Sequence, residues 1–443
     1  MKPCLAESWE ISDDGLVYTF HLRKGVKFHD GTSFNADVVK ASLERAINLQ
    51  GDPAFLLDVI DRVEVVDDYT VKIYLKYPFS PMLAVLAFTV SYPVSPNTPT
   101  DSFVEPPNWV VGTGPYKIAS WSPDKELVLE AFDDYWGTPP KTKRIVIRFY
   151  ERAETLRMDI ETGAIDVAFR HLLPADIVDL KNKPEVVKVW EGPGTFIRYI
   201  VFNVTQPPFD NVNVRRAIAA AVNREIICEQ VFLGTTTPLY SMIPMGMWSH
   251  TDAYKDKYGE HNIELAKQYL QAAGYSETNK LEIKLYYTPT HYGTMEADVA
   301  QLIKNALEET GMIEVELVYE EWATYIDHMT AGVYGMFLLG WYPDYLDPDD
   351  YIYPFVHSSG SPSLGCFYSN PTMDKLIEDA RKESDISKRT EIYKDIQDLM
   401  ADEVPVLPLF QGKQYCVTKP DVKGVTLDTT MIFRYYLLYR EVS

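Results

Sequence analysis

The sequence predicts an α/β protein of two lobes, with the second lobe inserted into the first. The chain has 443 residues, too many for one ordinary hydrophobic core, which suggests two or three domains. Residues 281–340 alternate strand and helix patterns, which is typical of a parallel sheet with its own core. Strand-rich segments lie on both sides of this stretch, since residues 17–75 are β-rich and β character returns near Gln414.

The first of these segments is predicted to form strands around one helix. Residues 17–22 and 71–76 alternate apolar and polar side chains, and the acidic pair at 67–68 favours a hairpin turn. Between them, Asn35 is a plausible N-cap for a helix with an apolar stripe over residues 39–47. Further on, a strand–helix–strand pattern over residues 145–169 predicts a parallel βαβ unit.

The inserted lobe is predicted from a longer alternation of the same kind. Gly311 closes its first long helix. The expected strands are 281–287, 314–319 and 335–340, and the expected helices are 296–310, 323–330, 373–382 and 388–400.

Composition excludes several classes of function. The net charge is −22, from 64 acidic against 42 basic residues, which argues against nucleic acid and is compatible with a neutral or cationic ligand or with solubility alone. No apolar run is long enough to span a membrane. The four cysteines are far apart and form no zinc pattern, although one disulfide, such as Cys228 with Cys366, is possible in an oxidising compartment. No dinucleotide, phosphate-loop or hydrolase motif is complete, so we expect no cofactor and no bound metal.

Ligands of parallel sheets bind outside the carboxyl ends of the strands, and this rule selects particular loops. In the inserted lobe the loops are 288–293, 320–322 and 341–345, and in the first lobe the loop follows Phe169. Two such edges facing each other would form an aromatic-walled cleft with a few charges. The candidate site residues on these loops are Asp344, Trp322, Trp341, Tyr345, Tyr292, His171 and Arg170, beside His291, Glu321 and Tyr342.

The acidic and aromatic run from Trp341 to Asp350 is the most unusual local sequence. It suits an ammonium or hydroxyl-bearing ligand, through charge-assisted hydrogen bonds and stacking. As a calcium loop it lacks a third ligand and the glycine, and as a glycosidase pair it is unspecific. A solvated Asp-Pro turn is the alternative.

An ordered set of motifs resembles the oligopeptide, dipeptide and nickel-binding class of solute-binding proteins of ABC transporters. The motifs are LAESWE at 5–10, YTFHLRKGVKFHDGTSFNADVV at 18–39, VGTGPYK at 111–117, DDYWG at 133–137, GAIDV at 163–167, FDNVNVRRAI at 209–218 and AVNREI at 221–226. The resemblance implies the periplasmic-binding-protein-like fold of type II, with an extra β subdomain and two crossover strands near 196–200 and 414–417. It places the first lobe at 1–195 with a return at 415–443, and the second lobe at 196–414.

The resemblance also implies two roles in the site. In peptide-binding members an aspartate in a Trp-x-x-Asp loop holds the ligand's amino group, which matches Asp344. A tryptophan nineteen residues before that loop's tryptophan, in a Glu-Trp pair, matches Trp322. Dipeptide-binding relatives carry an arginine after the strand that matches 281–287, and here Tyr292 stands near that place. A dipeptide is therefore doubtful, and longer peptides, amines, sugars and metal chelates stay open.

The function implied is capture of a solute between two lobes by hinge closure, and delivery to an ABC permease. The protein is expected to be a monomer in the periplasm or at the outer face of the membrane. Members of the class have more residues before Leu5, including a signal sequence, so we expect the first lobe to lack its N-terminal part. The alternatives are the sensing module of a regulator, or a hydrolase using Asp344 with Asp347 or Asp349.

Overall fold

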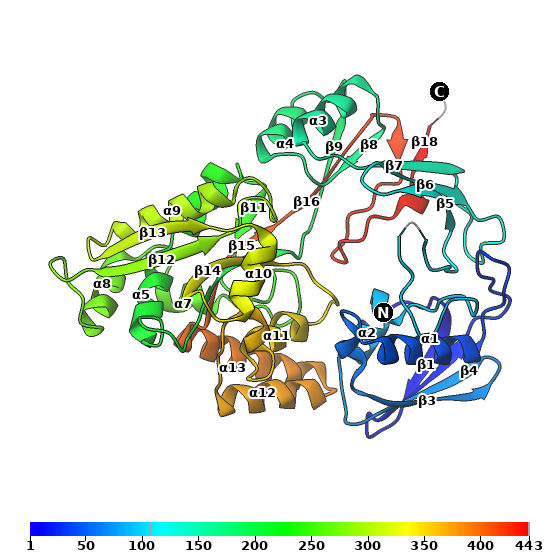
Figure 1. Ribbon diagram of the computed structural model, residues 1–443, viewed down its shortest axis with the longest axis horizontal. Coiled ribbons are helices and arrows are strands. Elements are labelled where there is room, and N and C mark those ends of the chain that lie inside the picture. The colour runs from blue at the N-terminus through cyan, green and yellow to red at the C-terminus, as the bar shows by residue number, and fades with distance from the viewer. Residues whose placement is uncertain (107, 442–443) are drawn as a thin grey trace.

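The computed structural model of the protein describes residues 1–106 and 108–441 and has three parts (Figure 1). A second lobe of helices and one large sheet lies on one side. A first lobe of smaller sheets and a small β subdomain lie on the other. The chain is therefore an α/β protein of two lobes, as predicted.

The second lobe is built on a six-stranded mixed sheet of order β11-β15-β10-β14-β12-β13. Strand β12 pairs in parallel with β13 and β14, as predicted, whereas β10 pairs antiparallel with both β14 and β15. The prediction of a purely parallel sheet is thus incomplete, because β10 runs opposite to its two neighbours β14 and β15. The strands are β10 (Ile197–Phe202), β11 (Thr236–Pro238), β12 (Leu281–Tyr287), β13 (Ile313–Tyr319), β14 (Met336–Trp341) and β15 (Val406–Gly412).

Helices cover both faces of this sheet, and every residue of β10 and β15 is buried. Asn211, Asn370 and Asp385 begin three of the helices, and each side chain accepts a backbone N–H of the first turn. The helices are α5 (Val212–Ala221), α6 (Arg224–Ile226), α7 (Ala253–Tyr258), α8 (Ile263–Ala272), α9 (Glu296–Glu308), α10 (Trp322–Thr330), α11 (Tyr353–Val356), α12 (Pro371–Lys382) and α13 (Ile386–Glu403).

The first lobe contains separate small sheets, and the predicted parallel βαβ unit is wrong. Strand β7 pairs antiparallel with β6, and β8 pairs antiparallel with β16, so the two strands never meet. A local hairpin and a strand returning from the far end of the chain outcompete the expected pairing. The elements are β5 (Tyr116–Ser122), β6 (Glu126–Ala131), β7 (Arg144–Arg148), β8 (Val167–Phe169), β9 (Lys188–Gly192), β16 (Gln414–Thr418), β17 (Val422–Lys423), β18 (Tyr439–Arg440), α3 (Ala153–Thr162) and α4 (Pro174–Lys181).

The small β subdomain is an antiparallel sheet of order β1-β2-β4-β3 packed on one helix. The helix begins as predicted, since Asn35 Oδ1 accepts the Val38 N–H at 3.1 Å. The elements are β1 (Ala6–Ile11), β2 (Val17–Leu22), β3 (Ile60–Asp67), β4 (Thr70–Leu75), α1 (Ala36–Leu49) and α2 (Met82–Leu86).

Two adjacent strands carry the chain between the lobes. The chain enters the second lobe at β10 and leaves it where β15 ends and β16 begins. Gly194 and Gly412 let these two crossings approach closely, because a Cβ atom on Gly194 would lie 2.0 Å from the carbonyl oxygen of Gly412. The Gly412 N–H also donates to the Phe196 carbonyl at 3.0 Å.

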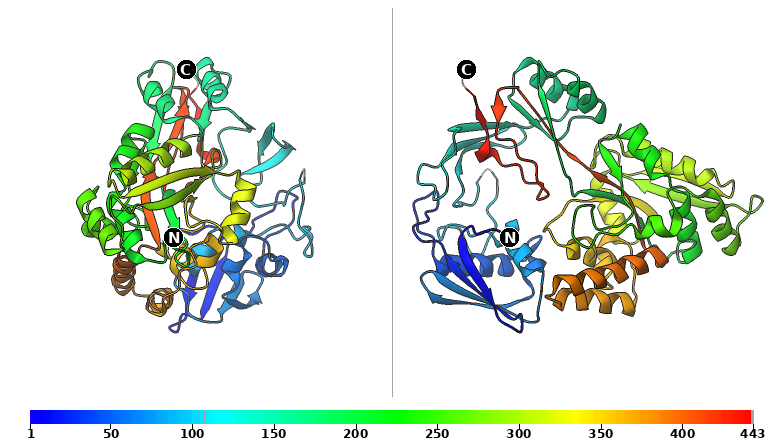
Figure 2. Two further views of the ribbon diagram at one scale, coloured as in Figure 1. Left: turned by 60° about the vertical axis from the view of Figure 1, so that its left-hand side comes forward. Right: turned by 180° about the vertical axis from the view of Figure 1, so that it is seen from behind.

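The small β subdomain also contacts the second lobe directly (Figure 2). The Ser80 N–H donates to the Arg381 carbonyl at 2.7 Å, and its hydroxyl donates to the Glu383 carbonyl at 2.5 Å. Tyr345 of the second lobe belongs to the apolar core of the subdomain. The loop that carries Asp344 is therefore in contact with both the second lobe and the small β subdomain.

The disulfide that the sequence left possible between Cys228 and Cys366 is not formed, since all four cysteines are free. Cys228 and Cys366 are both buried, and the Cys366 thiol donates to the Pro405 carbonyl at 3.5 Å.

Across residues 1–106 and 108–441, none of the helices combines the length and the apolar character needed to cross a bilayer.

Candidate ligand site

The three predicted loops of the second lobe meet at one edge of its sheet. The His291 ring stacks on the Trp322 indole, with 3.5 Å between ring centroids and an interplanar angle of 5°. The Tyr292 hydroxyl donates to the Gly340 carbonyl at 3.2 Å, and its ring lies edge-on to Trp322. Parallel pairing of β12 with β13 and β14 brings these loops together, since their carboxyl ends share an edge.

A buried ion pair beneath this edge was not anticipated. The Arg198 Nε donates to Glu296 at 3.1 Å, and its guanidinium carbon lies 3.9 Å from the centre of the Tyr292 ring. Burial raises the pKa of Glu296, and the guanidinium opposes this rise. The charges of Arg198 and Glu296 compensate each other. Because the guanidinium held in this pair packs against the Tyr292 ring, Arg198 positions Tyr292. In the sequence, the sign of this pair was Arg198, a single arginine within the otherwise apolar residues of β10.

The acidic loop after β14 contains four carboxyl groups, and within the described residues two of them pair with arginines. Arg389 binds Asp347 through two nitrogens, at 2.8 and 2.9 Å. Arg381 binds Asp349 at 2.9 to 3.2 Å. Asp344 and Asp350 have no basic partner among the residues that the structure describes. The arrangement leaves two acids available to a cationic ligand or to protons.

Asp350 organises the loop around Asp344. Its Oδ2 accepts the Trp341 Nε1–H at 3.1 Å and the Asp344 backbone N–H at 3.3 Å. Burial raises the pKa of Asp350 well above its usual range, and the negative charge of Asp344 raises it further. Burial also raises the pKa of Asp344, whose side chain is half-buried.

Tyr345 does not offer the stacking surface that the sequence suggested. Its side chain is only 5% exposed, because the ring packs into the core of the small β subdomain. Its hydroxyl donates to Asp349 Oδ2 at 2.8 Å. Tyr345 therefore attaches the acidic loop to the small β subdomain. The sequence did not indicate that Tyr345 is buried, because its burial depends on the packing of the subdomain against the second lobe.

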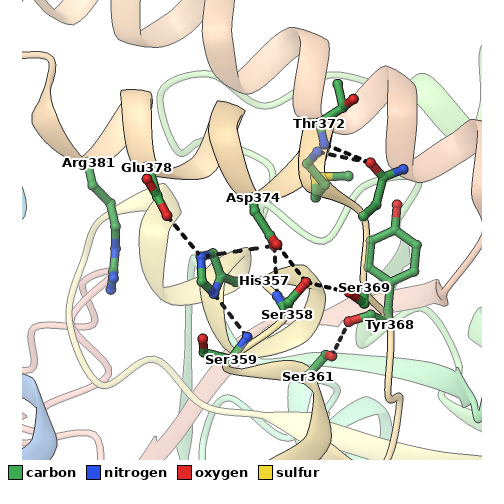
Figure 3. A network of polar contacts seen from close by, with 12 residues as sticks. His357, Ser358, Ser359, Ser361, Tyr368, Ser369, Thr372, Asp374, Glu378 and Arg381 are labelled. Carbon is green, nitrogen blue, oxygen red and sulfur yellow. Dashed lines mark hydrogen bonds and ion pairs between the residues drawn. The ribbon is translucent and has the colours of Figure 1, made fainter.

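A polar network lies against the N-terminal half of α12, the helix that carries Arg381 near its other end (Figure 3). Asp374 accepts both the N–H and the hydroxyl of Ser358, at 2.8 and 2.6 Å. His357 Nδ1 accepts the Ser359 N–H at 3.1 Å, so a neutral ring carries its proton on Nε2, toward Asp374 and Glu378. The network fixes the start of the helix that supplies Arg381.

The first-lobe loop reaches the second lobe through Arg170. Both Arg170 and His171 have positive φ angles, of 65° and 62°, which non-glycine residues adopt rarely. Arg170 donates to the Met431 carbonyl at 3.0 Å, and its guanidinium carbon lies 5.4 Å from the centre of the Tyr342 ring. His171 instead lines a cavity of about 560 Å³ inside the first lobe, between β7 and β8. Arg170 thus belongs with the loops of the second lobe, and His171 does not.

Among residues 1–106 and 108–441, no group of three or more His, Cys, Asp or Glu side chains is arranged to hold a metal ion.

Two lobes joined by adjacent crossings, with aromatic and acidic loops at a sheet edge, define a binding protein of the two-lobed type. The chain belongs to the bacterial extracellular solute-binding proteins of family 5, whose model matches residues 1–363. The prediction of a solute-binding protein of the ABC-importer class is therefore confirmed, and the hydrolase alternative is wrong, because the homologues are binding proteins rather than enzymes.

The similar proteins are described as binding proteins for dipeptides, glutathione or a peptide. The dipeptide-binding protein of Escherichia coli K12 is 30% identical over 457 residues, covering 96% of this chain and 84% of its own. The glutathione-binding protein GsiB of the same strain is 32% identical, covering 96% and 83%. Among solved structures, the periplasmic binding protein DppA of Helicobacter pylori in complex with peptide STSA has a TM-score of 0.84 at 28% identity, covering 100% of this chain and 90% of that one. The predicted type II fold with two lobes is confirmed by this match.

Proposed function

We propose that this protein captures a short peptide or a related amine and holds its ammonium group on Asp344. The observation that carries the proposal is the Asp344 carboxylate, which is half-buried and has no hydrogen bond or ion pair with the described residues. A carboxylate in such surroundings favours a cationic partner, since its own charge is poorly solvated. The descriptions of the relatives, which name dipeptide, glutathione and a tetrapeptide, support the same class of ligand.

The other side chains of the edge would orient the ligand. Trp322, Trp341 and Tyr292 would supply flat apolar surface, and Trp322 would first have to lose or share its stacking partner His291. Arg170 would contact the ligand from the first lobe, because it lies against Tyr342, two residues before Asp344. A ligand bridging Asp344 and Arg170 would favour the closed arrangement of the lobes.

We further propose the division of the chain and its place in transport. The first lobe would comprise residues 1–195 and 415–443, and the second lobe residues 196–414, in accord with β10 beginning at Ile197 and β16 at Gln414. The closed protein would act outside the cytoplasm as a monomer and deliver its ligand to an ABC permease.

Isothermal titration calorimetry with the peptide Ser-Thr-Ser-Ala and its N-acetyl form tests the proposal. We expect the free peptide to bind and Asp344→Asn to lose about 2–4 kcal/mol, on the order of 30- to 1,000-fold in affinity. The matched control is Asp395→Asn, an exposed aspartate on α13, which should bind as the unaltered protein does. Equal affinity for the acetylated peptide would contradict the role of Asp344, and no binding of either form would contradict the peptide class.

A further inference from the structure

The acidic loop contains two carboxyl groups that lack a compensating charge. Asp347 and Asp349 are neutralised by Arg389 and Arg381. Asp350 is 1% exposed and Asp344 is half-buried, and neither contacts a basic side chain in the described part of the chain. Burying an unpaired carboxylate is costly enough that such a group usually binds a proton instead.

Asp344 and Asp350 lie in the same loop, and the negative charge of Asp344 adds to the rise in the pKa of Asp350. A single oxygen of Asp350 accepts the Asp344 backbone N–H at 3.3 Å and the Trp341 indole N–H at 3.1 Å. The other Asp350 oxygen receives no hydrogen bond from the described residues, so it can carry a proton without breaking a contact. When two carboxyl groups interact strongly, their protons are lost in steps that belong to the pair.

The groups around Asp350 do not supply the missing positive charge. Asp349 of the same loop is committed to Arg381 of α12, and Tyr345 donates to Asp349. Tyr351 donates its hydroxyl to the Thr195 carbonyl at 2.7 Å. Burial raises the pKa of Asp350 and of Asp344, which agrees with a protonated pair.

We propose that Asp350 holds a proton in the ligand-free protein, and that the ammonium group of the ligand, by adding a positive charge beside the pair of Asp344 and Asp350, displaces this proton into solvent. This inference rests on the proposed function, since it places an ammonium group on Asp344. The O–H bond of the carboxyl group breaks, the proton passes to water or buffer, and the ammonium group keeps all of its own protons. Capture of the ligand is therefore coupled to proton release.

The coupling fixes the direction of the pH dependence. The ligand binds the deprotonated pair, whereas the raised pKa values favour the protonated pair in the empty protein. Affinity should therefore rise with pH, by up to about tenfold per pH unit, until the empty pair is itself deprotonated. Asp350→Asn keeps an oxygen acceptor for Trp341 and removes the second acid, so it should flatten this dependence.

Infrared titration of the ligand-free protein tests for the proton on Asp350 without any ligand. We expect a carbonyl band of a protonated carboxyl group that persists at neutral pH and is lost in Asp350→Asn. Asp344→Asn should keep the band but lose it at a lower pH, because the negative charge of Asp344 no longer raises the pKa of Asp350. The control Asp395→Asn should retain the band. Absence of this difference at every pH would overturn the proposal.

Calorimetry with Ser-Thr-Ser-Ala in phosphate and in Tris buffer counts the protons released on binding. We expect up to one proton released by the unaltered protein, and fewer by Asp350→Asn. Peptide binding with no proton release would overturn the coupling and leave the proposed function standing. Failure of the peptide to bind would refute the proposed function and the displacement with it, and the infrared band would still decide whether the empty pair holds a proton.

Discussion

Replacing Arg381 with methionine should strongly destabilise the protein. The Asp349 side chain is 0% exposed and makes three contacts with the Arg381 guanidinium, at 2.9, 3.0 and 3.2 Å. Methionine keeps an apolar stem against Tyr353 and Phe79, which the guanidinium now covers, but it leaves the buried Asp349 without a compensating positive charge. The perturbation therefore removes one charge from a buried pair and changes little else.

The magnitude follows from the burial of Asp349. Removing one partner of a buried ion pair costs about 3–5 kcal/mol, because the remaining charge is uncompensated. For a domain of the size of the second lobe, each kcal/mol lowers the melting temperature by about 2–4 °C. We expect Arg381→Met to melt about 6–20 °C lower. Ligand affinity should fall as well, since Tyr345 and the acidic loop are fastened to Asp349.

Differential scanning calorimetry with two companion variants checks this reasoning. Lys375→Met on the same helix removes an exposed cation that pairs with Asp379, and should change stability by less than about 0.5 kcal/mol. The double variant Arg381→Met with Asp349→Asn should recover most of the lost stability, because no buried charge remains. A melting temperature for Arg381→Met equal to that of Lys375→Met would refute the argument.

Two further predictions concern the thiols and the crossings. At pH 8 a disulfide reagent should label only the exposed Cys4 in the native protein and all four cysteines in denaturant, because burial raises the pKa of Cys228 to about 11 and of Cys366 to about 12. Rapid native labelling of more than one thiol would contradict the buried positions. Gly194→Ala should cost about 1–3 kcal/mol in thermal unfolding, because its Cβ atom would overlap the Gly412 carbonyl, whereas Gly114→Ala, which meets nothing within 4 Å, should be tolerated. Equal stability of the two variants would show that the crossings can separate.

Much of the second lobe was predictable because its signals are local. Strand β12 coincides with the predicted range, and α12 and α13 lie within a few residues of theirs, since the periodicity of apolar side chains depends only on near neighbours. The meeting of His291 with Trp322 followed from the rule that parallel strands share a carboxyl edge.

Pairings between distant segments were decided only by the tertiary structure. Strand β8 pairs with β16, some 250 residues away, and no local pattern distinguishes that partner from β7. The same holds for the site. The sequence by itself marked an acidic, aromatic loop at the end of β14, because residue types and strand order are local properties. Only the fold decided that Asp349 pairs with Arg381 and Asp347 with Arg389, and that Tyr345 covers and binds Asp349. It also left Asp344 and Asp350 with neither arginine, because charge compensation depends on side chains that meet in space.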